Sequence, residues 1–381
     1  MSKKKLSILI YSLSSGGAER VVSILLNELK NEFNITLFLM NKTIFHEIPK
    51  EINIIYLENS NPFENGIKKL LKLPLLAFKY KKICKNLKID VSLSFMNRPN
   101  YINTLSKLFG NRSKVLISER AMPSLQHKYG IQGKINRVLI KYLYNISDKI
   151  IANSLGNSKD LIKNFSIKKE KLVTIYNPIE IERIKNSSKE KLKFNFDRFT
   201  FVTIGRLDIG KNHKFMIEAF SKIENKKTQL LIIGDGELKN KLETEIKNLN
   251  LEDRVFLLGR QKNPYKYLLK SDCFLFSSKH EGFPNVLLEA LACELPIISS
   301  DCKSGPREIL APNSDLNIKL DKTEIAEYGI LYPVDDEKNF VEAINTILNN
   351  QNLVYSYKKE AKIRLNSFRL QKIKKQFIKL I

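Results

Sequence analysis

Residues 6–22 read LSILIYSLSSGGAERVV and contain an apolar run, a turn with two adjacent glycines and the start of an amphipathic stretch. This arrangement predicts a β-strand, a turn and an α-helix, the repeating unit of a parallel sheet. Basic residues precede the run, as they do in a signal peptide. The long amphipathic stretch that follows Ser-Ser-Gly-Gly-Ala-Glu does not fit a cleavage site, so we expect a first strand here.

The same alternation of apolar runs and amphipathic stretches continues along the chain. Helical periodicity is clear at 19–32 and 135–144, and again from about residue 337 onward. The expected strands, all short and mostly apolar, are 6–11, 35–40, 52–56, 91–94, 114–118, 149–152, 199–204, 229–233, 254–258, 273–277 and 296–299. Such a pattern predicts an α/β fold with parallel sheets covered by helices on both faces.

The pattern pauses at 177–198, where the chain is polar and rich in lysine. We interpret this stretch as a linker between two Rossmann-like domains, 1–176 and 199–355. A chain of 381 residues is long enough for two hydrophobic cores. Two open sheets joined in this way predict a central cleft, with ligands beyond the carboxyl ends of the strands.

The net charge of +25 is unevenly distributed. The first 200 residues contain 36 Lys and Arg against 16 Asp and Glu, a net +20, whereas the remainder contains 29 against 24, a net +5. A genome that favours lysine codons would explain part of the excess but not its asymmetry. The asymmetry indicates an anionic partner for the first half, such as a membrane surface, a phosphorylated substrate or nucleic acid.

Cysteine usage and hydropathy bear on the compartment. Cys84, Cys273, Cys293 and Cys302 form no Cys-x-x-Cys pair and lie at no metal-ligand spacing from a histidine. Reduced, buried cysteines in a cytoplasmic protein are therefore expected. No apolar run approaches the ~20 residues that span a bilayer, so any membrane contact is expected at its surface.

Two loops that follow expected strands suit phosphate binding. Gly16 and Gly17 allow close approach of the backbone, and the helix that opens there offers free N–H groups. Arg206 and Lys211 place two cations on one loop after strand 199–204. Because a departing nucleoside diphosphate develops negative charge, such a pair would stabilise it; a solvated surface loop is the alternative.

Residues 281–289, EGFPNVLLE, carry the sharpest signal. They follow strand 273–277, and Pro284 suits the first position of a helix, so the next three N–H groups should be unpaired and suited to a diphosphate. Glu281 would reach a sugar and Glu289 both ribose hydroxyls; a solvated helix face is the alternative. The expected ligand-binding residues of the motif are Glu281, Gly282, Phe283, Pro284, Asn285, Val286, Leu287 and Glu289.

Smaller motifs end other strands of the second domain. Gly234, Gly259 and Arg260 belong to glycine turns that would hold a flat base through backbone contacts. Residues 303–308, KSGPRE, follow strand 296–299 and would line the same cleft. No Asp-x-Asp sequence occurs.

Three motifs occur in a fixed order: Gly-Gly-Ala-Glu at 16–19, Gly-Arg-x-x-x-x-Lys at 205–211 and Glu-(x)7-Glu at 281–289. Together they resemble the retaining glycosyltransferases of family 4, over essentially the whole chain. The resemblance implies the GT-B fold, a nucleotide-sugar donor and no metal or other cofactor. It also implies that the last helix, about 356–381, returns to the first domain.

The resemblance assigns roles to the motif residues. Arg206 and Lys211 would bind the donor diphosphate, and Glu281 the donor sugar; these three are the expected catalytic residues. Glu289 would bind the ribose. The base would lie against the backbone at 259–260, and the glycines at 16 and 17 would approach the diphosphate from the other domain.

One position departs from the family pattern. Many members have a histidine after the strand that corresponds to 114–118, but this chain has Arg120. The sugar contact of that histidine is therefore not expected here. Arg120 would instead meet an acceptor phosphate.

A closer resemblance rests on SLSSGGAERVV at 12–22, FMNRPNYI at 95–102, NPYKYL at 263–268 and KSGPREIL at 303–310. These stretches look like the N-acetylgalactosaminyltransferases of bacterial protein N-glycosylation. The resemblance implies α-1,4 transfer of GalNAc from UDP-GalNAc to undecaprenyl-diphosphate-linked GalNAc–diacetylbacillosamine. Transferases of lipopolysaccharide O-antigen or capsule assembly, which use another UDP-hexose or UDP-HexNAc, share much of the pattern and are the alternative, followed by a sugar-nucleotide epimerase.

Residues 65–89 contain no acidic residue. Their apolar residues recur at roughly helical spacing, with Pro74 as a kink or break, and such a basic amphipathic stretch predicts binding to an anionic bilayer at the inner face of the cytoplasmic membrane. The lysines of this window are Lys68, Lys69, Lys72, Lys79, Lys81, Lys82, Lys85 and Lys88. An ordinary surface helix is the alternative, and residues 370–381 are a second membrane candidate. Nucleic acid is not expected, because few aromatic side chains interleave with these lysines.

Overall fold

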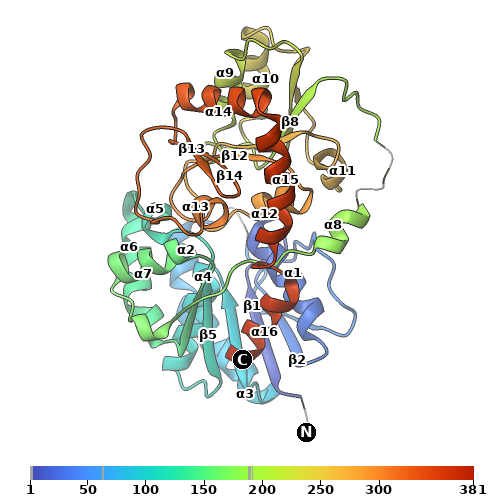
Figure 1. The fold of residues 1–381 in the computed structure, drawn as a ribbon. Helices are drawn as coiled ribbons and strands as arrows, with labels where there is room; N and C mark the ends of the chain where they lie inside the picture. Colours follow the sequence, from blue (N-terminus) through green and yellow to red (C-terminus); the bar gives the residue numbers. More distant parts are fainter. Residues whose placement is uncertain (1–2, 62–63, 188–189, 191) are drawn as a thin grey trace. The chain divides into compact units, whose positions relative to one another are not determined.

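The computed structural model describes residues 3–61, 64–187, 190 and 192–381. The chain forms two compact units, one of Met1–Pro178 with Gln371–Ile381 and the other of Ile179–Leu370. Each unit contains one seven-stranded sheet with helices packed against it (Figure 1). The predicted α/β class with two Rossmann-like units is confirmed.

The first sheet is parallel throughout, with strand order β3-β2-β1-β4-β5-β6-β7. The sequence predicts six of these strands to within one residue at each end and misses the short edge strand β7. The strands are β1 (Lys5–Ile10), β2 (Asn34–Leu39), β3 (Asn53–Tyr56), β4 (Val91–Phe95), β5 (Lys114–Glu119), β6 (Lys149–Ala152) and β7 (Leu172–Thr174).

The second sheet has the order β10-β9-β8-β11-β12-β14-β13, and all neighbours are parallel except β13 and β14. Here the sequence predicts five strands and misses the last two, which form an antiparallel pair. The strands are β8 (Phe199–Ile204), β9 (Thr228–Ile233), β10 (Val255–Leu257), β11 (Cys273–Phe276), β12 (Ile297–Ser300), β13 (Glu324–Ala326) and β14 (Gly329–Tyr332).

Helices connect the strands and bury their apolar faces against both sheets. Those of the first unit are α1 (Gly17–Leu29), α2 (Gly66–Leu71), α3 (Leu73–Leu87), α4 (Asn97–Leu108), α5 (Pro123–Gln126), α6 (Gly130–Leu143), α7 (Leu155–Phe165) and α16 (Leu370–Leu380). Those of the second unit are α8 (Ile181–Ser187), α9 (His213–Ser221), α10 (Lys239–Asn248), α11 (Tyr265–Leu268), α12 (Asn285–Ala292), α13 (Pro306–Leu310), α14 (Glu337–Asn349) and α15 (Gln351–Leu365). Pro74 lies in the first turn of α3, so the predicted break falls between α2 and α3.

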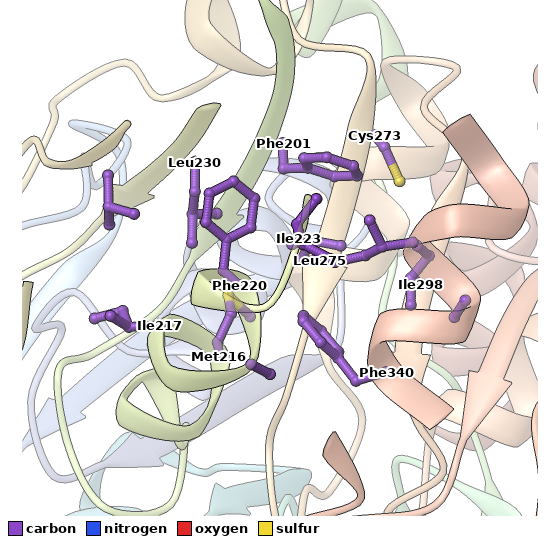
Figure 2. Close-up of a cluster of buried hydrophobic side chains, with 14 of the residues drawn as sticks. Phe201, Met216, Ile217, Phe220, Ile223, Leu230, Cys273, Leu275, Ile298 and Phe340 are labelled. Atoms are coloured by element: carbon purple, nitrogen blue, oxygen red, sulfur yellow. The ribbon is translucent and has the colours of Figure 1, made fainter. Parts of the chain in front are cut away.

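The core of the second unit shows why its strands are so apolar. Phe201 on β8 and Leu275 on β11 are fully buried between the sheet and its helices (Figure 2). Phe220 on α9 and Phe340 on α14 cover them from the helical side. Strands buried on both faces cannot alternate with polar residues, and this is the pattern that the sequence shows.

The units divide the chain differently from the predicted boundaries in two places. The predicted linker, 177–198, contains α8, which packs against α11 and α12 of the second unit. The predicted returning segment, about 356–381, begins too early, because its first ten residues, 356–365, lie in α15 of the second unit. The hydroxyl of Tyr357 on α15 donates to the carbonyl of Ala326 or Gly329 in the second unit, at 3.1 and 3.0 Å.

The last helix, α16, does return to the first unit. Ile373 and Phe377 are buried in the core of the first sheet, and so is Ile381. The ammonium of Lys374 pairs with Glu32 on the loop after α1 at 3.4 Å. Helical periodicity cannot tell α15 from α16 in this respect, because it shows that a helix has an apolar face but not which core that face covers.

Candidate active site

The sheet topology of each unit marks where a ligand would bind. In the first sheet the strand order reverses between β1 and β4, and in the second between β8 and β11. Open parallel sheets bind ligands beyond the carboxyl ends of the strands at such a reversal. The three sequence motifs follow β1, β8 and β11.

The loop after β8 is organised around Asp208, which the sequence analysis does not single out. Its carboxylate accepts a hydrogen bond from Arg206 Nε and another from the backbone N–H of Lys211, at 3.0 Å. Burial by itself would raise the pKa of Asp208, but the two hydrogen-bond donors outweigh this effect, so the pKa lies below its usual value. The carboxylate therefore stays charged and holds the loop in shape. The Arg206 side chain remains 76% exposed.

Lys211 and Glu281 meet, although 70 positions separate them in the sequence. The ammonium of Lys211 donates to Glu281 Oε1, and both side chains are largely buried. The same ammonium lies 5.9 Å from the ring centre of Phe276, the last residue of β11. Two of the three predicted catalytic residues thus form one ion pair, which links the loops after β8 and β11.

Gly234 is required for backbone packing. A Cβ added there would lie 1.8 Å from the carbonyl oxygen of Gly205, on the neighbouring loop. The N–H of Gly234 donates to the carbonyl of Gly259 at 3.0 Å. Gly259 has φ +66° and open space where a Cβ would be, and Arg260 is exposed. Contact of the base with the backbone at 259–260 therefore remains a prediction. The glycine at 234 is explained by its close packing against Gly205.

The helix after β11 begins one residue later than predicted. Pro284 precedes the helix as its N-cap, and α12 starts at Asn285. Of the three N–H groups expected to be unpaired, that of Leu287 donates to the carbonyl of Pro284 at 3.2 Å. The later start of the helix has a local cause, because ψ of Pro284 is 105°, which is extended rather than helical.

The rest of the 281–289 motif is anchored on the second unit. Phe283 is buried against the ring of Phe368, with ring centres 5.6 Å apart. The carbonyl of Gly282 accepts a hydrogen bond from Ser304 Oγ at 2.7 Å. Glu289 accepts one from the hydroxyl of Tyr265 at 3.3 Å. Tyr265 lies in the NPYKYL stretch, for which the sequence predicts no ligand contact.

Within the 303–308 segment Lys303 is exposed, but Arg307 has a structural role. The Arg307 side chain is 6% exposed and pairs with Asp301 and Glu324, both at 2.8 Å. These carboxylates outweigh burial, so the pKa of Arg307 is raised. Gly305 has φ +99°, and a Cβ there would lie 2.3 Å from Pro284 Cδ. The segment thus supports the loop before α12.

In the first unit, the glycine turn after β1 leads into α1 as predicted. Gly16 is the N-cap residue, and Gly17 is the first residue of the helix. Glu19 folds back over the turn, so that a Cβ on Gly16 would lie 2.2 Å from Glu19 Oε2. Ser14 Oγ donates to the same carboxylate at 3.0 Å. An acidic group thus lies at the N-terminus of α1, where the helix dipole favours negative charge.

Arg120 is held within the first unit. Its guanidinium donates to Asn177 Oδ1 and to Ser118 Oγ, the latter at 3.4 Å, and lies 5.9 Å from the ring centre of Phe95. Burial lowers its pKa to about 10, although the charge of Glu119 opposes the shift. Its Nε is buried and has no hydrogen-bond partner within the described part of the chain.

Beside Arg120 lies a polar cluster that the sequence analysis misses. The hydroxyl of Tyr144 donates to the buried carboxylate of Glu119 at 2.7 Å, and burial raises the pKa of this carboxyl group. Asn97 Nδ2 contacts His127 Nε2. Met96, between β4 and α4, has φ 72°, which is uncommon for a residue with a side chain. Strained backbone of this kind often marks a functional site, and it is a signal that only coordinates provide.

Comparison with known proteins identifies the family. Residues 15–183 match the model described as Glycosyltransferase Family 4, and residues 184–364 match the one described as Glycosyl transferases group 1. The chain is 43% identical, over 99% of both chains, to the Campylobacter jejuni N-acetylgalactosamine-N,N'-diacetylbacillosaminyl-diphospho-undecaprenol 4-alpha-N-acetylgalactosaminyltransferase. The chain is a family 4 glycosyltransferase.

Two further proteins are similar to this glycosyltransferase, one in sequence and one in structure. A second Campylobacter jejuni enzyme, the GalNAc-alpha-(1->4)-GalNAc-alpha-(1->3)-diNAcBac-PP-undecaprenol alpha-1,4-N-acetyl-D-galactosaminyltransferase, is 28% identical over 99% of this chain and 98% of its own. The crystal structure of HepE from Anabaena in complex with UDP matches with a TM-score of 0.80 and 19% identity, covering 99% of both chains. The predicted GT-B fold is thereby confirmed.

The basic window of the glycosyltransferase combines structural lysines with exposed ones. Lys72 pairs with Glu64 and, at 3.5 Å, with Glu58, and the ammonium of Lys79 donates to the carbonyl of Leu57 at 2.6 Å. These two predicted membrane contacts therefore have partners within the fold. The other lysines of α2 and α3 are exposed or half-buried: Lys68, Lys69, Lys81, Lys82 and Lys85.

The helices of this window have two apolar faces. One face is buried and covers the sheet, as the surface-helix alternative requires, with Leu73, Leu76, Ala77, Tyr80 and Cys84. The other face is exposed to solvent and consists of Ile67, Leu71, Leu75 and Phe78, of which Leu71 is 76% exposed. Packing against the sheet does not account for this second face, which we call the α2–α3 stripe.

Among the described residues, no group of three or more His, Cys, Asp or Glu is placed to hold a metal ion. No described helix is long and apolar enough to cross a membrane. The four cysteines are free and buried, as predicted.

Proposed function

We propose that this glycosyltransferase transfers GalNAc from UDP-GalNAc, in α-1,4 linkage, to undecaprenyl-diphosphate-linked GalNAc–diacetylbacillosamine. The full-length 43% identity to the Campylobacter jejuni enzyme named for this reaction carries the proposal. The enzyme named for a longer acceptor of the same series is only 28% identical. This difference favours the shorter acceptor.

The second unit supplies the chemistry for the donor. Arg206 and Lys211 bind the diphosphate together with the first turn of α12, and Glu289 binds the ribose. The C1–O bond to the diphosphate breaks, and the acceptor hydroxyl forms the new C1–O bond on the same face, so the configuration is retained. The hydroxyl proton passes to a phosphate oxygen of the departing UDP. The charge that develops on UDP is stabilised by fixed cations and helix N–H groups.

The Lys211–Glu281 pair suits this role in a particular way. Glu281 holds the ammonium in place before the donor binds, and its carboxylate contacts the donor sugar afterwards. These fixed cations supply the positive charge that a divalent ion would otherwise provide. We therefore propose transfer without a metal cofactor.

The first unit binds the acceptor, and the α2–α3 stripe binds the inner face of the cytoplasmic membrane. An exposed aliphatic stripe beside lysines is typical of helices that lie in an anionic bilayer surface. The stripe contains one aromatic residue, Phe78, which argues against a surface for stacking nucleic acid bases. A peripheral enzyme at this surface would meet its lipid-linked acceptor there.

The test supplies the purified protein with radiolabelled UDP-GalNAc, UDP-GlcNAc or UDP-galactose and the undecaprenyl-diphosphate-linked disaccharide, in the presence of EDTA. We expect transfer from UDP-GalNAc alone, with the linkage then determined by NMR. Transfer that requires added Mg²⁺ would contradict metal independence. Absence of transfer from any donor, with UDP binding intact, would exclude this acceptor and favour an O-antigen or capsule intermediate. Consumption of UDP-sugar without acceptor would indicate an epimerase.

A further inference from the structure

A second exposed apolar face lies on α6, outside the basic window of residues 65–89. Ile131, Val138 and Tyr142 recur at helical spacing, and they are between 55% and 75% exposed. Tyr129, just before the helix, is 77% exposed. The opposite side of α6 packs in the core through Ile140 and Leu143. Folding of the first unit therefore does not require the outer face, which we call the α6 stripe.

The α6 stripe adjoins the α2–α3 stripe. A Cβ added to Gly66, the first residue of α2, would lie 2.5 Å from the side-chain amide of Gln132 in the first turn of α6. Ile67, which follows Gly66, and Ile131, which precedes Gln132, are both exposed. Figure 1 shows α2 and α6 side by side in the first unit. The N-terminal turns of α2 and α6 are thus in contact, and the two stripes adjoin at this end.

The sequence that carries both stripes is strongly basic, and the two acids that precede it, Glu58 and Glu64, pair with Lys72. Residues 65–147, which span both stripes, contain 17 Lys and Arg but only two acids, Asp90 and Glu119. Glu119 is buried, and Asp90 accepts the backbone N–H of Lys5 at 2.8 Å. On α6 itself Lys134 and Lys141 are exposed. Neither stripe therefore has an acidic residue of its own.

We propose that the α6 stripe is a second membrane-binding element, and that it acts together with the α2–α3 stripe on an anionic bilayer. The inference rests on the membrane contact in the proposed function and extends it to a helix with no assigned role. Aliphatic residues beside tyrosines and lysines suit the interfacial zone, where aromatic rings lie at headgroup depth and lysine stems extend toward the phosphates. A second copy of this chain fits poorly, because two surfaces of the same positive charge repel each other.

Two contact elements also orient the first unit. Helix α2 follows β3, and α6 follows β5 and α5, so both helices begin at the edge of the sheet where the strands end. A bilayer in contact with both N-terminal turns holds that edge at headgroup depth. Arg120, which follows β5, belongs to the same edge. The diphosphate of a lipid-linked acceptor also lies at headgroup depth, so this orientation shortens its path to the site.

The test measures partitioning of the full chain onto vesicles of phosphatidylglycerol and phosphatidylethanolamine by co-sedimentation. The α6 variant carries Ile131→Ser, Val138→Ser and Tyr142→Ser, and the α2–α3 variant carries Leu71→Ser, Leu75→Ser and Phe78→Ser. The control carries Ile209→Ser, Ile325→Ser and Tyr355→Ser, which are comparably exposed positions of the second unit. All nine positions are exposed, so circular dichroism should show intact folding.

We expect each stripe variant to reduce partitioning at least about tenfold and the control to match the wild type. Lys134→Gln with Lys141→Gln should reduce it by about fivefold per lysine, and less at high salt. Unchanged partitioning of the α6 variant, with loss in the α2–α3 variant, would overturn the inference and leave the proposed function intact. So would a wild-type dimer that the α6 variant abolishes without loss of vesicle binding.

A second readout separates this inference from the proposed reaction. Transfer to a short-chain, water-soluble analogue of the acceptor, without vesicles, should proceed at the wild-type rate in the α6 variant. If the wild type itself fails to transfer, the proposed reaction is wrong while the partitioning result stands. If the α6 variant loses transfer to the soluble acceptor, the stripe contacts substrate rather than bilayer, and the inference is wrong.

Discussion

Arg206 presents its guanidinium to solvent while Asp208 fixes its direction. A cation held in this way needs little reorganisation when a diphosphate binds, which is the condition for strong electrostatic stabilisation of a leaving group. The neighbouring cation, Lys211, is instead paired with Glu281. The two predicted phosphate ligands therefore differ in their electrostatic setting, although the sequence presents them as equivalent.

We expect Arg206→Ala to lower kcat/KM by about 10²-fold or more, because it removes a charge that acts on the departing UDP. Arg206→Lys keeps the positive charge and should restore part of the rate. The rescue should be incomplete, because an ammonium cannot bind a phosphate through two parallel hydrogen bonds. The measurement is steady-state transfer with UDP-GalNAc. Ile209→Ser, on the same loop and similarly exposed, serves as the control. Nearly unchanged kcat/KM in Arg206→Ala would show that the assignment is wrong.

His213 provides a test based on pH. It is buried at the start of α9, and burial, with a contribution from the charge of Lys211, lowers its pKa from 6.5 to about 4. The folded protein therefore binds this proton less readily than the unfolded chain. The resulting stability is fully present above pH 6.5, falls as the pH decreases and is lost at about pH 4.

The expected loss is about 3 kcal/mol of unfolding free energy between pH 6.5 and pH 4. Urea denaturation followed by circular dichroism measures it, since the chain has no tryptophan. His213→Leu removes the titrating group, so the pH dependence of its unfolding free energy should be shallower by that amount. Equal slopes for the variant and the wild type would refute a depressed pKa.

At the scale of elements, the terminal helices show how similar periodicity leads to different packing. Helix α15 belongs to the second unit, where Tyr357 and Arg364 bond to backbone carbonyls. Helix α16, only a few residues later, buries Ile373 and Phe377 in the core of the first unit. The C-terminal helix α16 therefore completes the core of the first unit, which is otherwise built from the N-terminal half of the chain.

Phe377→Ala should destabilise the protein by about 3–5 kcal/mol, because it removes a fully buried ring from a core that can close over the cavity only in part. Urea denaturation should show the loss in the transition of the first unit. UDP binding, which we assign to the second unit, should stay intact. Lys375→Ala, an exposed position of the same helix, is the control. An unchanged unfolding midpoint in Phe377→Ala would contradict the packing of α16.

At the scale of the whole molecule, the sequence by itself determines the class and most of the sheet strands. Buried parallel strands must be continuously apolar and their helices amphipathic, so eleven of the fourteen strands in the described part of the chain are visible in the sequence as local patterns. The missed strands are β7, β13 and β14, of which β7 and β13 are three-residue edge strands that are not fully buried and therefore need no continuous apolar run. The motif order likewise identifies the family, because spacing along the chain is retained in the sequence.

Only the tertiary structure decides which of those residues meet and which are used for folding. The Lys211–Glu281 pair, the burial of Arg307 and the close packing of Gly234 all depend on loops that approach one another through neighbouring strands. The same holds for the two exposed stripes, because helical spacing reveals an apolar face but not whether the fold covers it. Local pattern reflects short-range periodicity, whereas contact and exposure are set by long-range packing, and that is why the sequence predicts the elements while the structure decides the partners of their side chains.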